Sequence, residues 1–419
     1  MCKNFYYWVV GIPILMGMNA CSSDEDVPTK DEEVVVVDLS ATEMANCYIV
    51  QHPGIYKFKA DNMFNQGPGL PVPPAISVDS ASLIWQTVPS SISSVSLIRD
   101  EGVPYIQFEV AEASGNVLLA ALDAEGAIEW SWHIWMPESE IQSVRTETGY
   151  EVMNINLGAM NNTPADAASY GLLYQWGRKD PFPAAATLTG DTQTVSAPMY
   201  DIENKEVKIS NSSWSSNGDN TIEYSIANPT VCLSNYSQYS SSRDWLKESI
   251  DNLWGNPEAY STNGTNKVVN KGKKTCYDPS PAGWRVAPPD VFANFTLNGG
   301  YAWTFEEFYV QDINEDGIID INDYNYGWFF YVNADQPLYF PAAARFDGSY
   351  AMLMGSMSGL WGNYWSNATY RDTSNTQGMG FCALAFQVKG QNGENWITVS
   401  PSAGGSRADA YSIRCVRDN

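Results

Sequence analysis

The chain has 419 residues, a formal net charge of −25 and only two histidines. This excess of acidic side chains excludes a nucleic-acid-binding protein, because phosphate contacts need clustered Lys and Arg, and it argues against docking on anionic lipid through a basic patch. A large negative charge suits a secreted, soluble surface or calcium binding. A Ser-His-Asp or Cys-His nucleophile would have to use His52 or His133, and neither stands in a recognisable catalytic context.

The N-terminus has the pattern of a lipoprotein signal peptide over residues 1–20. Lys3 is its only charge, an apolar stretch runs from Phe5 to Met18, and Ala20 precedes Cys21. The apolar stretch is shorter than the roughly 20 residues that a membrane-spanning helix needs. We therefore expect lipidation of Cys21; the alternative is an ordinary secretory signal that leaves this cysteine unmodified.

An acidic tether is predicted over residues 21–33. Its composition of Ser, Asp, Glu, Pro, Thr and Lys is typical of a solvated linker. The acidic run Ser22–Asp26 resembles the surface-export signal of Bacteroidetes lipoproteins. The resemblance implies an outer-membrane lipoprotein of the cell envelope that faces the cell exterior.

Residues 34–145 read as a β-sandwich domain. Short β-branched or aromatic runs alternate with turn residues such as Pro53-Gly54 and Gly115-Asn116. His133 lies in the tryptophan-rich run Ile128–Trp135, where a packed or edge histidine is expected. The predicted strands are Val34–Val37, Tyr48–Val50, Ile55–Phe58, Leu83–Val88, Tyr105–Val110, Val117–Leu122 and Ile128–Trp135.

Residues 146–419 read as one loop-rich α+β domain. An S-x-x-D start and an apolar stripe predict a helix over Ser241–Trp254. Proline in a first turn indicates a second short helix over Pro288–Phe295. The predicted strands at the end are Cys382–Val388, Trp396–Val399 and Tyr411–Val416.

The segment 312–323 fits a 12-residue calcium loop that ends in Asp in place of the usual Glu, as dockerin-type loops do. Oxygen-bearing side chains fall at positions 1, 3, 5, 9 and 12, and Gly317 stands at position 6. The flanks Phe305–Val310 and Tyr324–Val332 read as strands, and the alternative is a polar surface turn without an ion. The expected ligands are Asp312, Asn314, Asp316, the Ile318 carbonyl, Asp320 and Asp323.

Four blocks in order resemble the Fibrobacter succinogenes major paralogous (FISUMP) domain family. They are Tyr170–Phe182, Pro281–Val286 with Cys276 before it, Tyr364–Ser366 and Tyr411–Asp418. Upstream, Asn46–Val50 and Trp130–Trp135 are similar to the β domain that precedes this module in Bacteroidetes surface lipoproteins. The resemblance implies an envelope or adhesion role.

The terminal block and the Pro281–Val286 turn also resemble the C-type-lectin-like fold. This resemblance implies a disulfide between Cys276 and Cys415, whereas the pairing of Cys47, Cys232 and Cys382 stays open. The acidic partners that calcium-bridged sugar binding needs are missing at Gln336-Pro337-Leu338 and Trp365-Ser366-Asn367. Sugar binding of that kind is therefore not expected.

The function that we expect is non-catalytic binding or adhesion toward extracellular glycan or protein. The aromatic content of 13% supports it, and Trp361, Tyr364 and Trp365 are the candidate ligand contacts. One alternative is a pilus-tip or surface structural subunit, for which Val34–Val37 is the candidate donor strand. The second alternative is a glycoside hydrolase that uses an unmarked pair of carboxylates.

Overall fold

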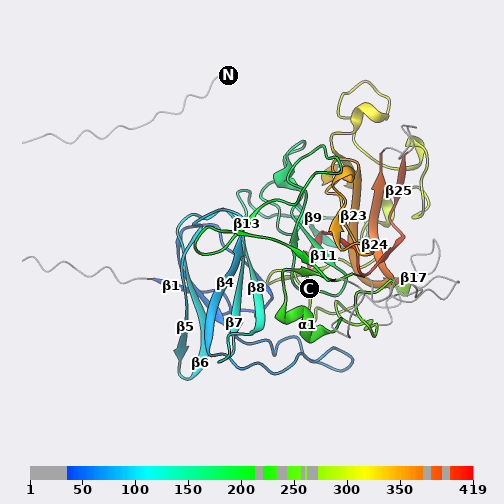
Figure 1. The fold of residues 1–419 in the computed structure, drawn as a ribbon. Coiled ribbons are helices and arrows are strands. Elements are labelled where there is room, and N and C mark those ends of the chain that lie inside the picture. Colours follow the sequence, from blue (N-terminus) through cyan, green and yellow to red (C-terminus); the bar gives the residue numbers. More distant parts are fainter. Residues whose placement is uncertain are drawn as a thin grey trace, which may run out of the picture. The chain divides into compact units, whose positions relative to one another are not determined.

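The computed structural model describes residues 35–212, 220–234, 243–255, 260–261, 272–370, 379–388 and 397–418 (Figure 1). The predicted signal peptide, Cys21 and the tether lie outside these residues. Residues 35–419 form one compact unit. Within the described ranges, no helix is long and apolar enough to cross a membrane.

The first part of the chain folds into two sheets, with strand orders β1-β3-β6-β5 and β14-β13-β4-β7-β8-β2. The sheets pack face to face through aromatic side chains: the rings of Phe58 and Trp132 lie 5.2 Å apart, one from each sheet. This arrangement agrees with the expected β-sandwich. Its strands are β1 (Val36–Asp38), β2 (Cys47–Ile49), β3 (Gly54–Lys59), β4 (Ser80–Gln86), β5 (Ile92–Asp100), β6 (Val103–Val110), β7 (Gly115–Leu122), β8 (Ile128–Met136), β13 (Met199–Tyr200) and β14 (Glu206–Val207).

Besides the two-residue strands β13 and β14, the element of this sandwich that the sequence did not predict is β5. It is an edge strand, and several of its positions are exposed and carry serine. These serines interrupt the alternation of apolar and polar residues by which a strand is predicted. The hairpin to β6 turns through Glu101 and Gly102, whose φ angles are +51° and +86°. Two consecutive left-handed residues match the twist of antiparallel strands, which is why such short turns favour glycine.

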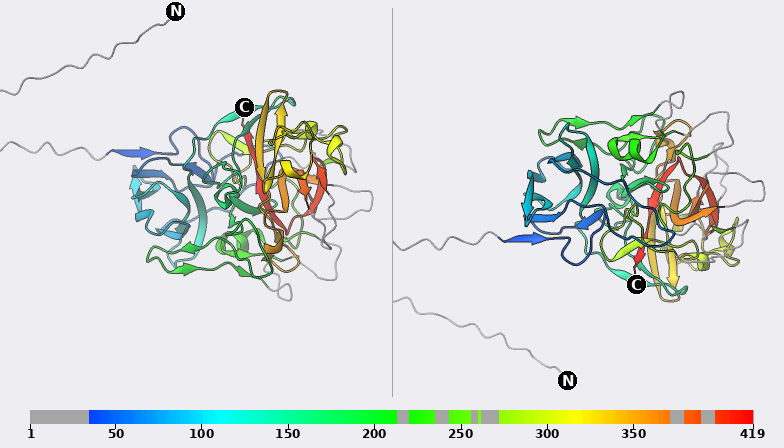
Figure 2. Two further views of the ribbon diagram at one scale, coloured as in Figure 1. Left: turned by 90° about the horizontal axis from the view of Figure 1, so that it is seen from above. Right: turned by 90° about the horizontal axis from the view of Figure 1, so that it is seen from below.

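The rest of the chain adds β structure with few helices (Figure 2). One sheet has the order β18-β28-β10-β9, a larger one has the path β12-β11-β27-β23-β24-β25, and β19 and β20 form a separate hairpin. The strands used below are β9 (Ser143–Arg145), β10 (Glu151–Met153), β11 (Leu172–Gln175), β12 (Phe182–Pro183), β18 (Trp284–Val286), β19 (Gly327–Asn333), β20 (Gln336–Pro341), β21 (Phe346–Asp347), β22 (Met352–Leu353), β23 (Trp361–Tyr370), β24 (Met379–Gln387), β25 (Thr398–Ser400), β26 (Ala403–Ser406), β27 (Ala410–Ile413) and β28 (Cys415–Arg417).

Both helix predictions need correction. Residues 243–255 form bends and turns, and the one α-helix of the described residues is α1 (Ile222–Ala227). Asp244 accepts a hydrogen bond from the Leu246 amide, and this side-chain contact competes with a helix. Trp245 is fully buried and donates to the Trp176 carbonyl at 2.9 Å. Of the predicted helix over Pro288–Phe295, the structure has the single 3-10 turn η2 (Ala293–Phe295).

The main hydrophobic core extends across residue 145, where the sequence suggested a domain boundary. It includes Trp132 of the sandwich together with Trp176 and Cys415 of the later sheets. The buried Asn46 side chain donates to the carbonyls of Cys276 and Asp278 at 2.7 and 2.9 Å. The two predicted regions therefore share one continuous interior.

His133 is buried in β8, as the sequence predicted. Its Nε2 lies 2.9 Å from Asn116 Oδ1 and its Nδ1 lies 3.3 Å from the Cys47 thiol. Burial lowers the pKa of His133 to about 3. The folded state therefore binds a proton at His133 less readily than the unfolded chain, whose histidine pKa is about 6.5.

We predict that His133 makes the protein less stable in acid. Its contribution is fully present above about pH 6.5 and is lost as the pH falls toward 3, with a limiting slope of about 1.4 kcal/mol per pH unit. Urea unfolding at several pH values between about 7.5 and 5 measures the slope. His133→Gln should flatten it relative to the wild type; an unchanged slope in this variant would contradict the assignment.

Candidate functional site

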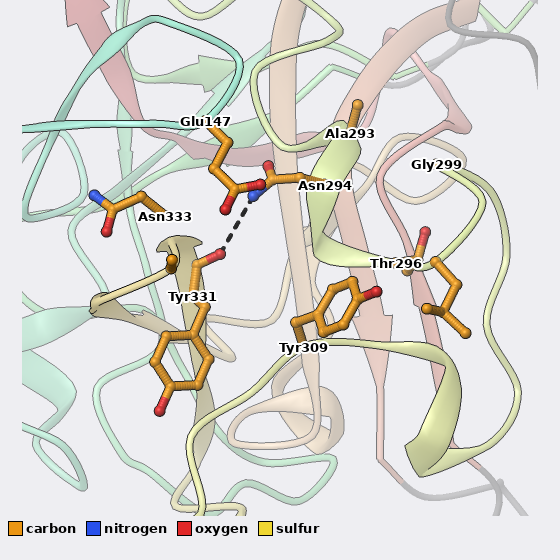
Figure 3. Close-up of a pocket in the computed structure, with 10 residues that line it drawn as sticks. Glu147, Ala293, Asn294, Thr296, Gly299, Tyr309, Tyr331 and Asn333 are labelled. Atoms are coloured by element: carbon orange, nitrogen blue, oxygen red, sulfur yellow. Dashed lines mark hydrogen bonds between the residues drawn. The ribbon is translucent and has the colours of Figure 1, made fainter.

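A hollow of about 550 Å³ opens beside the β19–β20 hairpin (Figure 3). Its polar and aromatic lining comes from Glu147, Asn294, Thr296, Tyr309 and Tyr331. Its volume lies within the usual range for small-molecule sites. Four separate segments of the chain contribute to it.

Backbone hydrogen bonds place these segments side by side. The Tyr309 amide donates to the Phe295 carbonyl at 3.0 Å, and the Tyr331 amide donates to the Tyr309 carbonyl at 3.2 Å. The Glu147 amide donates to the Val332 carbonyl at 2.9 Å. Since side chains alternate along extended backbone, the neighbours of the two tyrosines point into the core, while Tyr309 itself is 47% exposed.

The polar groups of this hollow can make further hydrogen bonds. Asn294 donates to the carbonyls of Tyr331 and Val332, both at 3.4 Å, which is long for a hydrogen bond. The Asn294 Oδ1 atom is buried and has no partner. Glu147 lines the same hollow, and Figure 3 shows the Tyr309 ring on the side of Thr296. The hollow thus offers hydrogen-bonding groups next to an exposed ring.

A second hollow of similar volume, about 600 Å³, lies near β14, β21 and β22. Its lining is mainly aliphatic, with Val195, Ile209 and Met352 among its members. Aliphatic walls bury apolar surface but give little orientation to a ligand, which a small number of placed polar groups usually supplies. The hollow beside β19 and β20 is therefore the better candidate for specific recognition.

The predicted calcium loop, 312–323, begins three residues after Tyr309. The Gly317 amide donates to Asp312 Oδ2 at 2.7 Å, and Gly317 has a φ of +84°. Asp323 is fully buried and closes the loop, because its two oxygens accept from the amides of Ile313 and Asp320, both at 2.9 Å. These contacts bring the first and last positions of the loop together.

The donor set of the loop fits a cation in part. Asp312 Oδ1 is buried without a partner, which is the state expected of an oxygen that awaits a cation. Asp316 and Asp320 instead accept from the backbone amides of Ile318 and Asn322. Across the part of the chain that the structure describes, no three His, Cys, Asp or Glu side chains gather closely enough to hold a metal. Ligation by the whole predicted set would thus require side chains to turn.

The flanks of this loop differ from the expected strands. The segment Phe305–Val310 contains the 3-10 turn η3 (Phe305–Glu307) and isolated bridges, and another turn, η4 (Ile321–Asp323), ends the loop. Strand β19 then starts at Gly327 rather than at Tyr324. The second flank is therefore a strand only in its later part.

Two of the three predicted ligand contacts lie in the core. Tyr364 and Trp365 are fully buried. Trp365 stacks on Tyr411 at 4.2 Å and donates to the Tyr174 carbonyl at 2.7 Å. Trp361 is only partly buried and lines a smaller hollow. The three residues lie close together in the sequence, and all belong to β23. In the structure, Tyr364 and Trp365 are in the core, whereas Trp361 lies at the hollow.

The expected disulfide between Cys276 and Cys415 is not formed in this structure. The Cys276 thiol lies 3.5 Å from the Pro71 carbonyl, and the Cys415 thiol lies 3.3 Å from Ser280 Oγ. Both cysteines are free and buried, and burial raises the pKa of each thiol to about 12. Cys47, Cys232 and Cys382 are also free and buried.

Comparisons with protein-family models, with curated proteins and with solved structures found no match. The structure does bring the blocks of the sequence resemblance together. Tyr174 pairs with Tyr411, Trp365 with Ile413, and Arg285 with Val416, each across neighbouring strands. The resembling residues are therefore mainly buried strand residues, and the hollow beside β19 and β20 lies outside the four blocks.

We predict that Trp365→Ala lowers the free energy of unfolding by about 3–5 kcal/mol, because it leaves a large cavity beside Tyr411. Trp361→Ala should cost much less, since that ring is partly exposed. Chemical denaturation of both variants tests the comparison. Equal losses would show that Trp361 is a core residue as well.

Proposed function

We propose that this chain is a surface-exposed outer-membrane lipoprotein that binds extracellular glycan or protein without catalysis. The observation that carries the binding role is the hollow lined by Asn294, Tyr309 and Tyr331. The lipobox-like sequence that ends at Cys21 and the acidic tether support the location. The adjoining strands and loops of 146–419 are compatible with a C-type-lectin-like fold, which we propose for this region.

A neutral glycan fits this hollow better than an anion. Aromatic rings stack on the apolar faces of sugars, and an exposed ring such as Tyr309 is available for that contact. The free oxygen of Asn294 and the Glu147 carboxylate accept hydrogen bonds from hydroxyl groups. A net charge of −25 opposes the approach of an anionic ligand.

Glycoside hydrolysis is the less favoured alternative for this hollow. The usual mechanism needs two carboxyl groups on opposite sides of the scissile bond. Glu147 is the one carboxylate among the described residues that line the hollow. The lining therefore supports binding more than cleavage.

A structural subunit that offers a donor strand is also less favoured. The candidate segment was Val34–Val37, and its residues Val36 and Val37 belong to β1. Val36 pairs with Ile55 of β3 in parallel register. A strand that is already paired in its own sheet is a poor donor to another subunit.

We further propose that the loop 312–323 binds calcium, with the ligands Asp312, Asn314, Asp316, the Ile318 carbonyl, Asp320 and Asp323. The unpartnered Asp312 oxygen and the sharp bend at Gly317 support the proposal. The loop leads from Tyr309 to β19, so an ordered loop would stabilise two walls of the hollow. We expect a structural role for the ion.

The binding role predicts that Tyr309→Ala weakens glycan binding by at least about tenfold, since it removes a stacking surface. A glycan panel with the purified ectodomain, with and without calcium, identifies the ligand, and titration calorimetry measures the loss. Tyr350→Ala is the matched control, because this tyrosine is 67% exposed and does not line the hollow. Equal affinity of the two variants would exclude the hollow as the site.

Calcium should raise the melting temperature of the ectodomain, because it binds the folded state. The stabilisation is about 2.7 kcal/mol at a free concentration one hundred times the Kd. Asp316→Ala should remove most of the shift, while Asp335→Ala, in the turn between β19 and β20, should keep it. Identical melting curves in calcium and in chelator would reject the metal site.

A further inference from the structure

A separate hollow of about 160 Å³ has a floor built from three neighbouring strands. In one row, Trp361 of β23 pairs with Gln387 of β24, which pairs with Thr398 of β25. Paired residues of adjacent strands lie on the same face of a sheet. The next row on this face is Asn363, Ala385 and Ser400. The side chains of this second row are small, so an open space, the hollow, remains above them.

Aromatic side chains form the walls and the rim. The Arg345 guanidinium lies over the Trp361 ring, 5.4 Å from its centroid, and Tyr411 closes another side. Tyr301, at the mouth, stacks on Trp303 with centroids 5.9 Å apart. These two side chains are 55% and 59% exposed, so a flat aromatic surface borders the opening.

The rim is held in place by the sheet. The Ala302 amide donates to the Val399 carbonyl at 2.8 Å, and the Val399 amide donates back at 3.1 Å. This pair of bonds fixes the segment 301–303 along the edge of β25. The stacked rings are therefore positioned before any ligand arrives, which lowers the entropic cost of binding.

Two N–H donors in this hollow lack acceptors. Asn363 is 8% exposed, and its Nδ2 atom is buried without a hydrogen-bond partner. The Nε atom of Arg345 is likewise buried and unpartnered. A buried donor without an acceptor loses its hydrogen bonds to water and gains none in return, which destabilises the folded state. A ligand that presents an acceptor oxygen to both groups would recover this energy.

The charges around Arg345 favour a neutral acceptor over a carboxylate. Its Nη2 lies 3.3 Å from Asp347 Oδ2, and its Nη1 lies 3.3 Å from Asp409 Oδ2. Two carboxylates thus offset one guanidinium. An incoming anion would meet a net negative environment, whereas a carbonyl oxygen would meet only the dipoles of the free N–H groups.

We propose that this hollow binds a neutral sugar residue that carries an N-acetyl group. The acetamido carbonyl accepts hydrogen bonds from Asn363 Nδ2 and Arg345 Nε, and the methyl group packs against Trp361. The hollow is smaller than a typical site for a whole ligand, so it takes the acetamido group while the sugar ring lies against Tyr301 at the rim. This inference stands independently of the hollow that contains Tyr309.

The test compares ligands on the wild-type ectodomain by saturation-transfer NMR. N-acetylglucosamine and its β-1,4 disaccharide should bind, with the strongest transfer to the acetyl methyl protons. Glucose and cellobiose, which lack the acetyl group, should bind at least tenfold more weakly, and glucuronate should show the same loss. Equal binding of glucose and N-acetylglucosamine, preference for glucuronate, or no transfer to any N-acetyl sugar at millimolar concentration would each overturn the proposal.

Variants locate the site. Asn363→Leu keeps the side-chain size and removes the donor, and Trp361→Ala removes the methyl contact; each should weaken N-acetylglucosamine binding at least tenfold. Tyr350→Ala, at an exposed tyrosine that lines neither hollow, should leave it unchanged. Melting curves identify a variant that fails to fold, and the ligand comparison on the wild type then decides the outcome. Loss of binding in Tyr309→Ala alone would place the sugar in the other hollow and refute this assignment.

Discussion

The β-sandwich and the later sheets are held together by the buried ion pair of Lys179 and Asp180, and the rest of the structure depends on this contact. Its Nζ and Oδ1 atoms lie 2.7 Å apart, and both side chains are 2% exposed. The ammonium also donates to the Ser131 carbonyl of β8 at 3.2 Å and lies over the Trp130 ring. Burial lowers the pKa of Lys179. Loss of either partner would leave an uncompensated buried charge, at a cost of about 3–5 kcal/mol.

Other buried cations fix the irregular segments in the same way. Arg407 contacts Asp244 at 3.1 Å and lies over the Trp176 ring at 4.4 Å. Arg414 donates to Asn156 Oδ1 at 2.9 Å and to the Tyr339 carbonyl at 2.8 Å. A guanidinium satisfies several carbonyls at once, so these side chains supply hydrogen bonds that regular helices would otherwise provide. Long connections can therefore be ordered in a protein with little helix.

The two polar hollows offer different hydrogen-bonding groups, because ordered loops form one of them and the face of a sheet forms the other. The hollow with Tyr309 is made by loops around one hairpin, and its acceptor oxygens suit hydroxyl groups. The hollow with Trp361 rests on the face of a sheet, and its free groups are donors. Under the two proposals made above, an extended glycan or a branched partner that reaches both hollows would be bound at two points, which would raise the effective affinity.

The sequence by itself determined the features that depend on near neighbours: the strands of the sandwich other than β5, β13 and β14, the buried position of His133 and the bend of the loop around Gly317. Each follows from side-chain alternation or from contacts within twelve residues. Only the tertiary structure decided the rest. Residues 243–255 do not form a helix because Trp245 and Asp244 bind distant partners, and each polar hollow gathers side chains from segments over 100 residues apart, which no local pattern encodes.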